Sequence, residues 1–328
     1  MKRWLLLLVL APVLIWSAYW GAAAFGMKHS LTTALSGQGF YGLSATAQAS
    51  HGRGFPSQFL FDVTDMELHQ AGMFSASIPS IQIEASAYTP HLINLELGDP
   101  QRVSTAFGET VIEADLFQIG IFLRPHLSVP LDRAGLRLES ANLTAPDYGK
   151  LLSVERLNMG FFESPESQSG QAEGLYRLNV EGAGIDVSEL LSDFPEEYHN
   201  ISNIRTDIGL IYSNLWDRSV LHTGVPLLRN VIIPEFELIW GPSEISLTGQ
   251  VSVSGQGTLT GDIVLDISAW RGFLMGAVQA EIVDPDLAAL ILQLMDGQDE
   301  NDTINLPLRI ENNLVSFGVF TLGFLPIP

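Results

Sequence analysis

Residues 244–269, EISLTGQVSVSGQGTLTGDIVLDISA, alternate between apolar and polar side chains for more than twenty residues. From Ile245 to Ile267 the odd positions are apolar or glycine, and the even positions are polar except for Val264. Because successive side chains of a strand point to opposite faces, this pattern predicts two antiparallel strands that share one apolar face. The apolar residues stay at odd positions on both sides of the turn. A three-residue loop at Ser254–Gln256 permits this, because its glycine can adopt the unusual dihedrals of such a loop.

Two registers fit this predicted hairpin. With the three-residue loop, Val251 faces Leu259 and Gly249 faces Gly261, so two opposed glycines leave a dent in the apolar face. A shift by one pair instead places Ile263 opposite Gly249 and fills the dent. The sequence leaves both registers open.

The apolar face of the hairpin has two interpretations. It is either core, packed on another sheet or on helices, or the wall of a groove that binds an apolar ligand. A sheet that bends around a partly open interior would satisfy both. The candidate ligand-binding residues on this face are Ile245, Leu247, Val251, Val253, Leu259, Ile263, Leu265 and Ile267.

Alternation with a period of two recurs along most of the chain, for example in FLFDVTDMELH, SIPSIQIEASAY, TVIEADLFQIGIFL and RAGLRLESANLTA. Turn residues such as Gly54–Pro56 and Gly98–Pro100 separate these runs. We therefore predict a mainly β protein: an elongated, curved antiparallel sheet, arranged as a groove or as two layers, over residues 29–328. The connection 163–174, ESPESQSGQAEG, is a soft boundary between two halves of this region.

Three short segments have helical spacing instead. DVSELLSDF (186–194) starts near an N-capping residue, either Asp186 or Ser188. AWRGFLMGAVQ (269–279) places its large apolar residues on one stripe, and DPDLAALILQLMDG (284–297) starts at a proline and stops at a glycine. We expect these few helices to cap or plug the sheet.

The first 28 residues predict a membrane anchor. Lys2 and Arg3 precede 22 residues without a charge, Trp4 to Phe25, which would span ~33 Å as a helix. Signal peptides have shorter apolar stretches, although Ala22–Ala24 would suit a signal peptidase. We expect a single-pass inner-membrane helix with a cytoplasmic N-terminus and a periplasmic remainder, the alternative being a cleaved signal peptide. The aromatic residues Trp16, Tyr19 and Trp20 fit an interface anchor near its outer end.

Charge and composition exclude several functions. The chain has 37 acidic and 16 basic residues, and every acidic residue lies at or after Asp62. Such a charge repels nucleic acid and anionic lipid headgroups, so we expect neither nucleic-acid binding nor membrane-surface binding by the part after the anchor. The chain contains no cysteine, which excludes disulfides and thiolate chemistry.

The sequence contains no recognisable catalytic or metal-binding motif. The seven histidines lack metal-ligand spacing, and the acidic run DGQDEND (296–302) lacks the glycine and the last glutamate of an EF-hand loop. GQGTLTG (255–261) leads into a strand, so it does not form a phosphate-binding helix start. We therefore predict no metal, no cofactor and no enzymatic activity.

Several segments resemble one bacterial family. GQVSVSGQGTLTGDIVLDISAWRGFL (249–274), the helical segment near 287–296 and LPLRIENNLVSFGVFTLGFLPIP (306–328) are similar to the family called domain of unknown function 2125. GFPSQFLFDVTDMEL (54–68), YTPHLINLEL (88–97) and the anchor at 4–25 match its N-terminal half. These motifs are turn residues and alternating strands, so the resemblance implies a fold and no chemistry.

The chain departs from this family at one turn. The last hairpin has Asn312–Asn313 where an acidic residue and a glycine are expected, and asparagine tolerates the same left-handed conformation. The family looks like a distant relative of the AsmA-like envelope proteins, a resemblance that implies a membrane anchor and a long curved sheet with a lipid-lined groove.

These observations favour a non-enzymatic role in maintaining the cell envelope, with lipid acyl chains bound in an apolar β-groove. The alternative is a scaffold that binds another envelope protein through an exposed strand edge. An envelope hydrolase is the third candidate, because a pair of catalytic carboxylates has no fixed sequence spacing.

Overall fold

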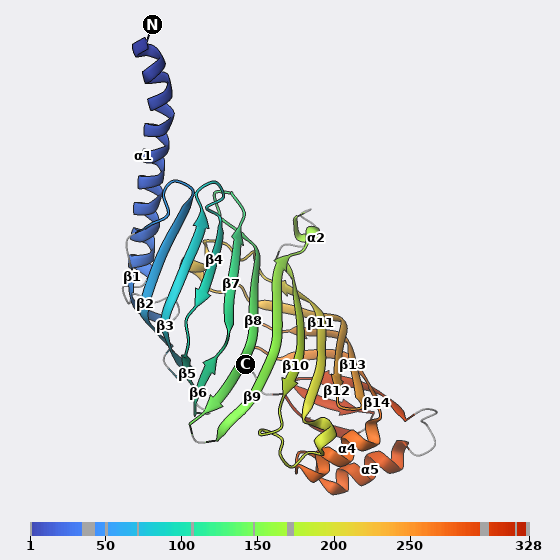
Figure 1. Cartoon of the computed structure of the whole chain (residues 1–328). Helices are drawn as coiled ribbons and strands as arrows, with labels where there is room; N and C mark the ends of the chain where they lie inside the picture. The colour runs from blue at the N-terminus through green and yellow to red at the C-terminus, as the bar shows by residue number, and fades with distance from the viewer. Residues whose placement is uncertain are drawn as a thin grey trace.

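The computed structural model describes residues 2–34, 43–49, 52–70, 72–105, 108–146, 148–168, 174–295, 302–318 and 320–325. In this part of the chain, 17 strands form one antiparallel sheet (Figure 1). The first nine strands are β1 (Leu43–Ala49), β2 (Gln58–Gln70), β3 (Phe74–Ser86), β4 (Leu92–Leu97), β5 (Gln101–Thr105), β6 (Gly108–Glu113), β7 (Leu116–Leu123), β8 (Leu131–Ala145) and β9 (Gly149–Glu163).

The remaining strands are β10 (Leu175–Asp186), β11 (Asn200–Tyr212), β12 (Leu228–Trp240), β13 (Ser243–Val253), β14 (Leu259–Ser268), β15 (Thr303–Glu311), β16 (Leu314–Phe317) and β17 (Phe320–Phe324). The helices are α1 (Lys2–Ala34), α2 (Pro165–Gln168), η1 (Glu196–Tyr198), α3 (Val220–Thr223), α4 (Trp270–Gln279) and α5 (Pro285–Met295). The predicted mainly β fold with a few short helices is thus confirmed.

The strands form a meander in which most strands pair with the next one along the chain. β3 pairs with both β4 and β5, and β8 pairs with both β6 and β7, so two positions in the sheet hold a pair of short strands end to end. β9 and β10 pair directly across the 163–174 connection. Among the described strands, β1 pairs with β2 alone and β17 pairs with β16 alone, so these two strands are the edges of the described sheet.

The alternation of side chains inverts at one residue in each of three strands. Asp65 in β2, Ser140 in β8 and Gly184 in β10 have left-handed backbones, with φ of 52°, 51° and 61°. Each of them is skipped in the pairing of its strand. Leu138 and Ala141 are consequently both buried although they are three residues apart. These irregularities keep the apolar side chains on one face while the strands bend.

Helices cover the apolar face of this curved sheet at its two ends. Side chains of α1 pack with β2 and β3 around Phe59 and Phe61, and α4 and α5 pack with β14 and β15 around Trp270 and Ile304. The central cluster, which includes Leu138 and Val154, consists of side chains from strands and the turns between them. Other apolar side chains of the central strands, such as Met159, are only half-buried.

Two of the three predicted helices are confirmed, as α4 and α5, and the third is wrong. Residues 188–193 form successive turns, followed by the single 3-10 turn η1. The carboxylate of Asp186 accepts a hydrogen bond from the backbone N–H of Ser188 at 3.0 Å. This local bond stabilises a turn, and Pro195 lacks the N–H that would continue a helix. The left-handed turn at Asn312–Asn313 is confirmed, with φ of 52° and 69°.

The N-terminal helix α1 projects beyond the sheet with its first half and packs on the sheet with its second half (Figure 1). The indole N–H of Trp16 donates to the carbonyl of Pro56 at 3.0 Å, and that of Trp20 donates to the carbonyl of Gln58 at 2.9 Å. Ala24 is buried against the sheet. None of the helices in the described ranges has both the length and the apolar character that crossing a membrane requires.

Candidate functional site

The hairpin of β13 and β14 adopts the shifted register. Ile263 lies opposite Gly249, and Gly261 lies opposite Val251. A Cβ at Gly249 would come within 2.4 Å of the carbonyl oxygen of Asp262, so glycine is required for this close approach. The loop is longer than the predicted Ser254–Gln256, because Val253 pairs with Leu259 and the left-handed glycine is Gly257 rather than Gly255.

All eight candidate ligand-binding residues of the hairpin lie on one face, as predicted. Ile245 and Val251 are buried, and the other six are half-buried. Ile267 packs against the α4–α5 cluster. The apolar face continues through direct cross-strand neighbours, for example from Ile263 to Leu308 in β15 and from Ile245 to Leu238 in β12. The hairpin is therefore one segment of a face that extends across the sheet.

The same face ends in an apolar cavity of about 680 Å³ beneath helix α1. Its walls are Phe59 and Phe61 of β2, Ile83 and Ala85 of β3, Ile93 and Leu95 of β4, Ile121 of β7, Pro90, and Tyr19, Ala23, Gly26 and Met27 of α1. We call this space the α1 cavity. Its volume falls within the ~300–1,000 Å³ typical of small-molecule sites.

Strand register explains why these strand residues converge. Phe61 lies opposite Ile83, Ile83 lies opposite Leu95, and Ile93 lies opposite Ile121, so their side chains point to the same face. None of the lining residues is charged. The phenol of Tyr19 donates to the carbonyl of Ala87 at 3.2 Å. The α1 cavity therefore suits an apolar chain, and Tyr19 is its one lining residue with a polar group on its side chain.

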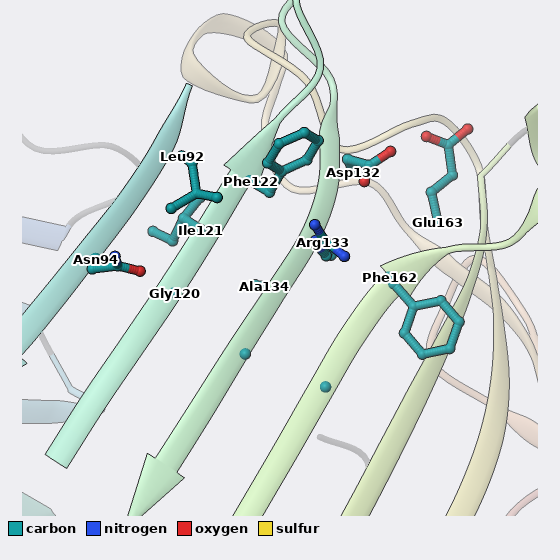
Figure 2. Close-up of a pocket in the computed structure, with 12 residues that line it drawn as sticks. Leu92, Asn94, Gly120, Ile121, Phe122, Asp132, Arg133, Ala134, Phe162 and Glu163 are labelled. Carbon is teal, nitrogen blue, oxygen red and sulfur yellow. The ribbon is translucent and has the colours of Figure 1, made fainter. Parts of the chain in front are cut away.

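A second hollow, of about 540 Å³, lies on the opposite, polar face (Figure 2). Gly120, Gly135 and Gly160 lie side by side on β7, β8 and β9 and form its floor. The guanidinium of Arg133 lies 4.9 Å from the ring centroid of Phe122. The lining of this hollow includes the charged side chains of Asp132, Arg133 and Glu163, whereas the lining of the α1 cavity carries no charge and water there costs free energy. We therefore take the α1 cavity, with the apolar face, as the candidate site.

An aromatic cluster borders the apolar face at the ends of β9, β10 and β11. Tyr176 is fully buried and stacks on Phe161 with 4.7 Å between ring centroids. Its hydroxyl accepts from the backbone N–H of Trp216 at 3.0 Å and donates to the carbonyl of Leu131 at 3.4 Å. Burial raises the pKa of Tyr176 to about 12. The buried carboxylate of Glu163 forms an ion pair with the guanidinium of Arg124 nearby.

Candidate metal ligands do not cluster in the described part of the chain. Within the ranges that the structure describes, no three or more histidines and carboxylates converge on one point. Of the acidic run 296–302, only Asp302 falls among the described residues. Its carboxylate pairs with the guanidinium of Arg271 at 2.8 Å.

The residues of the α1 cavity were not predicted as a site from the sequence. The strands FLFDVTDMELH and SIPSIQIEASAY were predicted with the correct alternation, but no site was predicted on them. Trp16, Tyr19 and Trp20, which were predicted to anchor the helix at a membrane interface, donate hydrogen bonds to the carbonyls of Pro56, Ala87 and Gln58. The sequence signal for this site was the pair of apolar residues Phe59 and Phe61 at alternate positions, which is the same kind of pattern as at 245–267.

Comparison with known proteins matches the chain to one family. Residues 20–326 match the family model DUF2125, described as "Uncharacterized protein conserved in bacteria". No curated protein and no solved structure matches the chain. Because the match covers nearly the whole length, the chain belongs to the DUF2125 family of bacterial proteins.

Proposed function

We propose that this protein binds lipid acyl chains without chemical conversion, in the α1 cavity and along the apolar face that leads from it. The observation that carries this proposal is the α1 cavity itself: about 680 Å³ of space with an uncharged lining at the end of a continuous apolar face. A role in maintaining the cell envelope follows from this binding.

The expected affinity arises from transfer of methylene groups out of water. Burial of each CH₂ contributes ~0.8 kcal/mol, so about ten methylenes contribute ~8 kcal/mol. Association costs roughly 4–15 kcal/mol in lost freedom of motion. Binding should therefore be reversible, as a carrier or a guard of lipid requires.

Two glycines of α1 allow a matched test. Both glycines are exposed, a Cβ at either position meets no atom within 4 Å, and only Gly26 lines the α1 cavity. Both Gly26→Leu and Gly21→Leu should stabilise the helix by ~0.8–1 kcal/mol, because glycine is a poor helix former. Only Gly26→Leu should fill the cavity.

We would measure lipid that co-purifies with the full-length chain by mass spectrometry, and binding of cis-parinaric acid by fluorescence. Gly26→Leu should lose most of the lipid and bind the probe at least tenfold more weakly, while Gly21→Leu should match the wild type. Equal lipid content and equal probe affinity in the two variants would refute the proposal. Absence of both lipid and probe binding in the wild type would refute it as well.

We also propose that α1 anchors the chain in the inner membrane, and that the sheet lies in the periplasm. The support is the uncharged run from Trp4, which follows Lys2 and Arg3, together with the exposed side chains of Leu14 and Ile15 on the projecting half of α1. A topology reporter fused after Pro328 should be active on the periplasmic side only. Recovery of a soluble form that starts near Phe25 would instead show a cleaved signal peptide.

The second candidate, an envelope scaffold, is favoured by the bare edge strand β17. All five residues of β17 are exposed, including Phe320, Leu322 and Phe324, and no charge lies between 314 and 325. Natural edge strands usually carry charges that prevent pairing with other chains, so an uncharged edge favours addition of a partner strand. Thr321→Lys should abolish such a complex in cross-linking experiments, whereas Thr260→Lys within β14 should leave it intact.

A further inference from the structure

We propose that the end of the sheet from which α1 projects lies directly on a phospholipid bilayer. This surface, which we call the rim, consists of the connections 52–57, 87–91, 124–130 and 213–227. Antiparallel pairing places all four at one end of the strands, because each precedes or follows a strand terminus that lies there. Figure 1 shows α1 rising past this end of the sheet.

Ring contacts and main-chain hydrogen bonds join the four connections into one surface around α1. Trp16 stacks on Tyr88 at 5.1 Å, and Trp20 meets the ring of Phe55 edge-on at 5.6 Å. The backbone N–H of Leu123 donates to the carbonyl of His91 at 2.9 Å, which links the second and third connections.

Two more main-chain bonds complete the rim. The N–H of Leu131 donates to the carbonyl of Trp216 at 2.7 Å, and the N–H of Arg218 donates to the carbonyl of Ser128 at 3.0 Å. These bonds join 124–130 directly to 213–227. The 164–174 connection, whose sequence contains Glu166 and Glu173, joins β9 to β10 at the same end of the sheet.

The rim exposes large apolar side chains. Leu127 is 83% exposed and Tyr88 is 67% exposed, and the others are Phe55, Val129, Val225 and Leu227. Every one of the four connections contributes at least one of these side chains. A cluster of exposed apolar residues that extends over several loops is typical of a surface that contacts membrane or protein.

Charge favours a membrane as the partner at this end. The four connections of the rim contain three arginines and one aspartate, and the 164–174 connection at the same end adds two glutamates, so the charges at this end cancel. At the opposite end, the described residues of the connections 187–199 and 269–302 include eight acidic residues and one arginine. The end with the rim is therefore less negative than the opposite end, and it repels anionic headgroups less than the net charge of −21 predicts.

The α1 cavity reaches the rim, because Pro90 of the connection 87–91 is one of its lining residues. Tyr19 and Pro90, which line the cavity, lie at the level of the connection 87–91, and Phe61 and Ile121 lie deeper along the strands. An acyl chain could pass from the bilayer into the cavity without crossing water. This consequence rests on the proposed function, whereas the contact between rim and bilayer does not.

The absence of native cysteine makes site-directed spin labelling a direct test. Nitroxides would be attached at Leu127→Cys and Val225→Cys in the rim, and at Tyr148→Cys and Leu190→Cys near the opposite end. All four native side chains are exposed and apolar. The labelled full-length chain would be reconstituted in vesicles of palmitoyl-oleoyl phosphatidylcholine, and collision rates with oxygen and with a water-soluble nickel chelate would be measured.

The two rim labels should collide with oxygen at least fivefold more often, relative to nickel, than the two labels at the opposite end. A rim as accessible to nickel as position 148 would overturn the proposal. Adding Leu227→Asp to the Val225→Cys protein should return that label to water, while circular dichroism remains unchanged. Immersion that persists in this variant would show that α1 alone places the label, and would also overturn the proposal.

The Gly26→Leu variant separates the rim from the lipid-binding proposal. It fills the cavity without altering a rim residue, so the label depths should stay the same. Immersed labels in a wild-type protein that binds no lipid would refute only the proposed function. Lipid binding with water-exposed rim labels would refute only the rim.

Discussion

Docking of α1 on the sheet should depend strongly on the buried side chain of Phe59. Phe59 is fully buried, and the indole of Trp20 stacks on it with 5.5 Å between ring centroids. Phe59→Ala removes this stack and leaves a void next to an existing cavity. A buried Phe→Ala change costs ~3–5 kcal/mol, of which loss of the aromatic pair accounts for ~0.5–1.5 kcal/mol.

Phe162 provides the matched control for this prediction. It lies on the polar face of β9, opposite Arg133, and is half-buried. Phe162→Ala deletes the same atoms where the ring is partly hydrated, so it should cost only ~1–2 kcal/mol. The two variants therefore differ in the burial of the deleted ring and in the presence of α1 above it.

Hydrogen exchange measured by mass spectrometry separates the two outcomes. In Phe59→Ala, amides of α1 between residues 16 and 27 should exchange ~10²–10³-fold faster, because each 1.4 kcal/mol is a factor of ten. In Phe162→Ala these amides should keep their protection. Equal loss of protection in both variants, or unchanged protection of α1 in Phe59→Ala, would refute the role assigned to this contact.

Two further predictions concern stability. The raised pKa of Tyr176 means that the fold favours the neutral phenol, so its contribution, on the order of 2–3 kcal/mol, is present below pH ~10 and is lost as the pH rises to ~12. Urea unfolding of Tyr176→Phe should show a smaller loss of stability over that range, and a loss equal to that of the wild type would contradict the assignment. Gly261→Ala should lower the free energy of unfolding by ~1–3 kcal/mol, since the added Cβ would come within 2.1 Å of the carbonyl oxygen of Gln250. Gly160→Ala in β9, where a Cβ meets no atom within 4 Å, is the control and should be nearly neutral in the same thermal melts.

The sequence by itself determined which residues share a face. Alternation with a period of two assigns Ile245 and Ile267 to the same side whatever their strands pair with, because this depends only on local backbone geometry. It also determined α4 and α5, whose apolar residues recur at helical spacing, and in α5 a proline at the start and a glycine at the end add to this signal. The segment 186–194 has similar spacing, but a side-chain bond from Asp186 and the proline at 195 leave it as turns.

Only the tertiary structure decided the register, the cavity and the rim. Gly249 could face either Gly261 or Ile263, and the longer loop around Gly257 made the choice. The α1 cavity joins residues of a helix and four strands that lie up to about a hundred positions apart, and no local pattern brings them together. The distribution of charge between the two ends has the same origin. Antiparallel pairing places successive connections at opposite ends of the sheet. The short strands β4 and β5, and β6 and β7, each occupy one strand position end to end, and this determines which later connections share an end. Long-range pairing of this kind is a property of the folded sheet. It places acidic connections such as 187–199 at one end and the connections of the rim around α1 at the other.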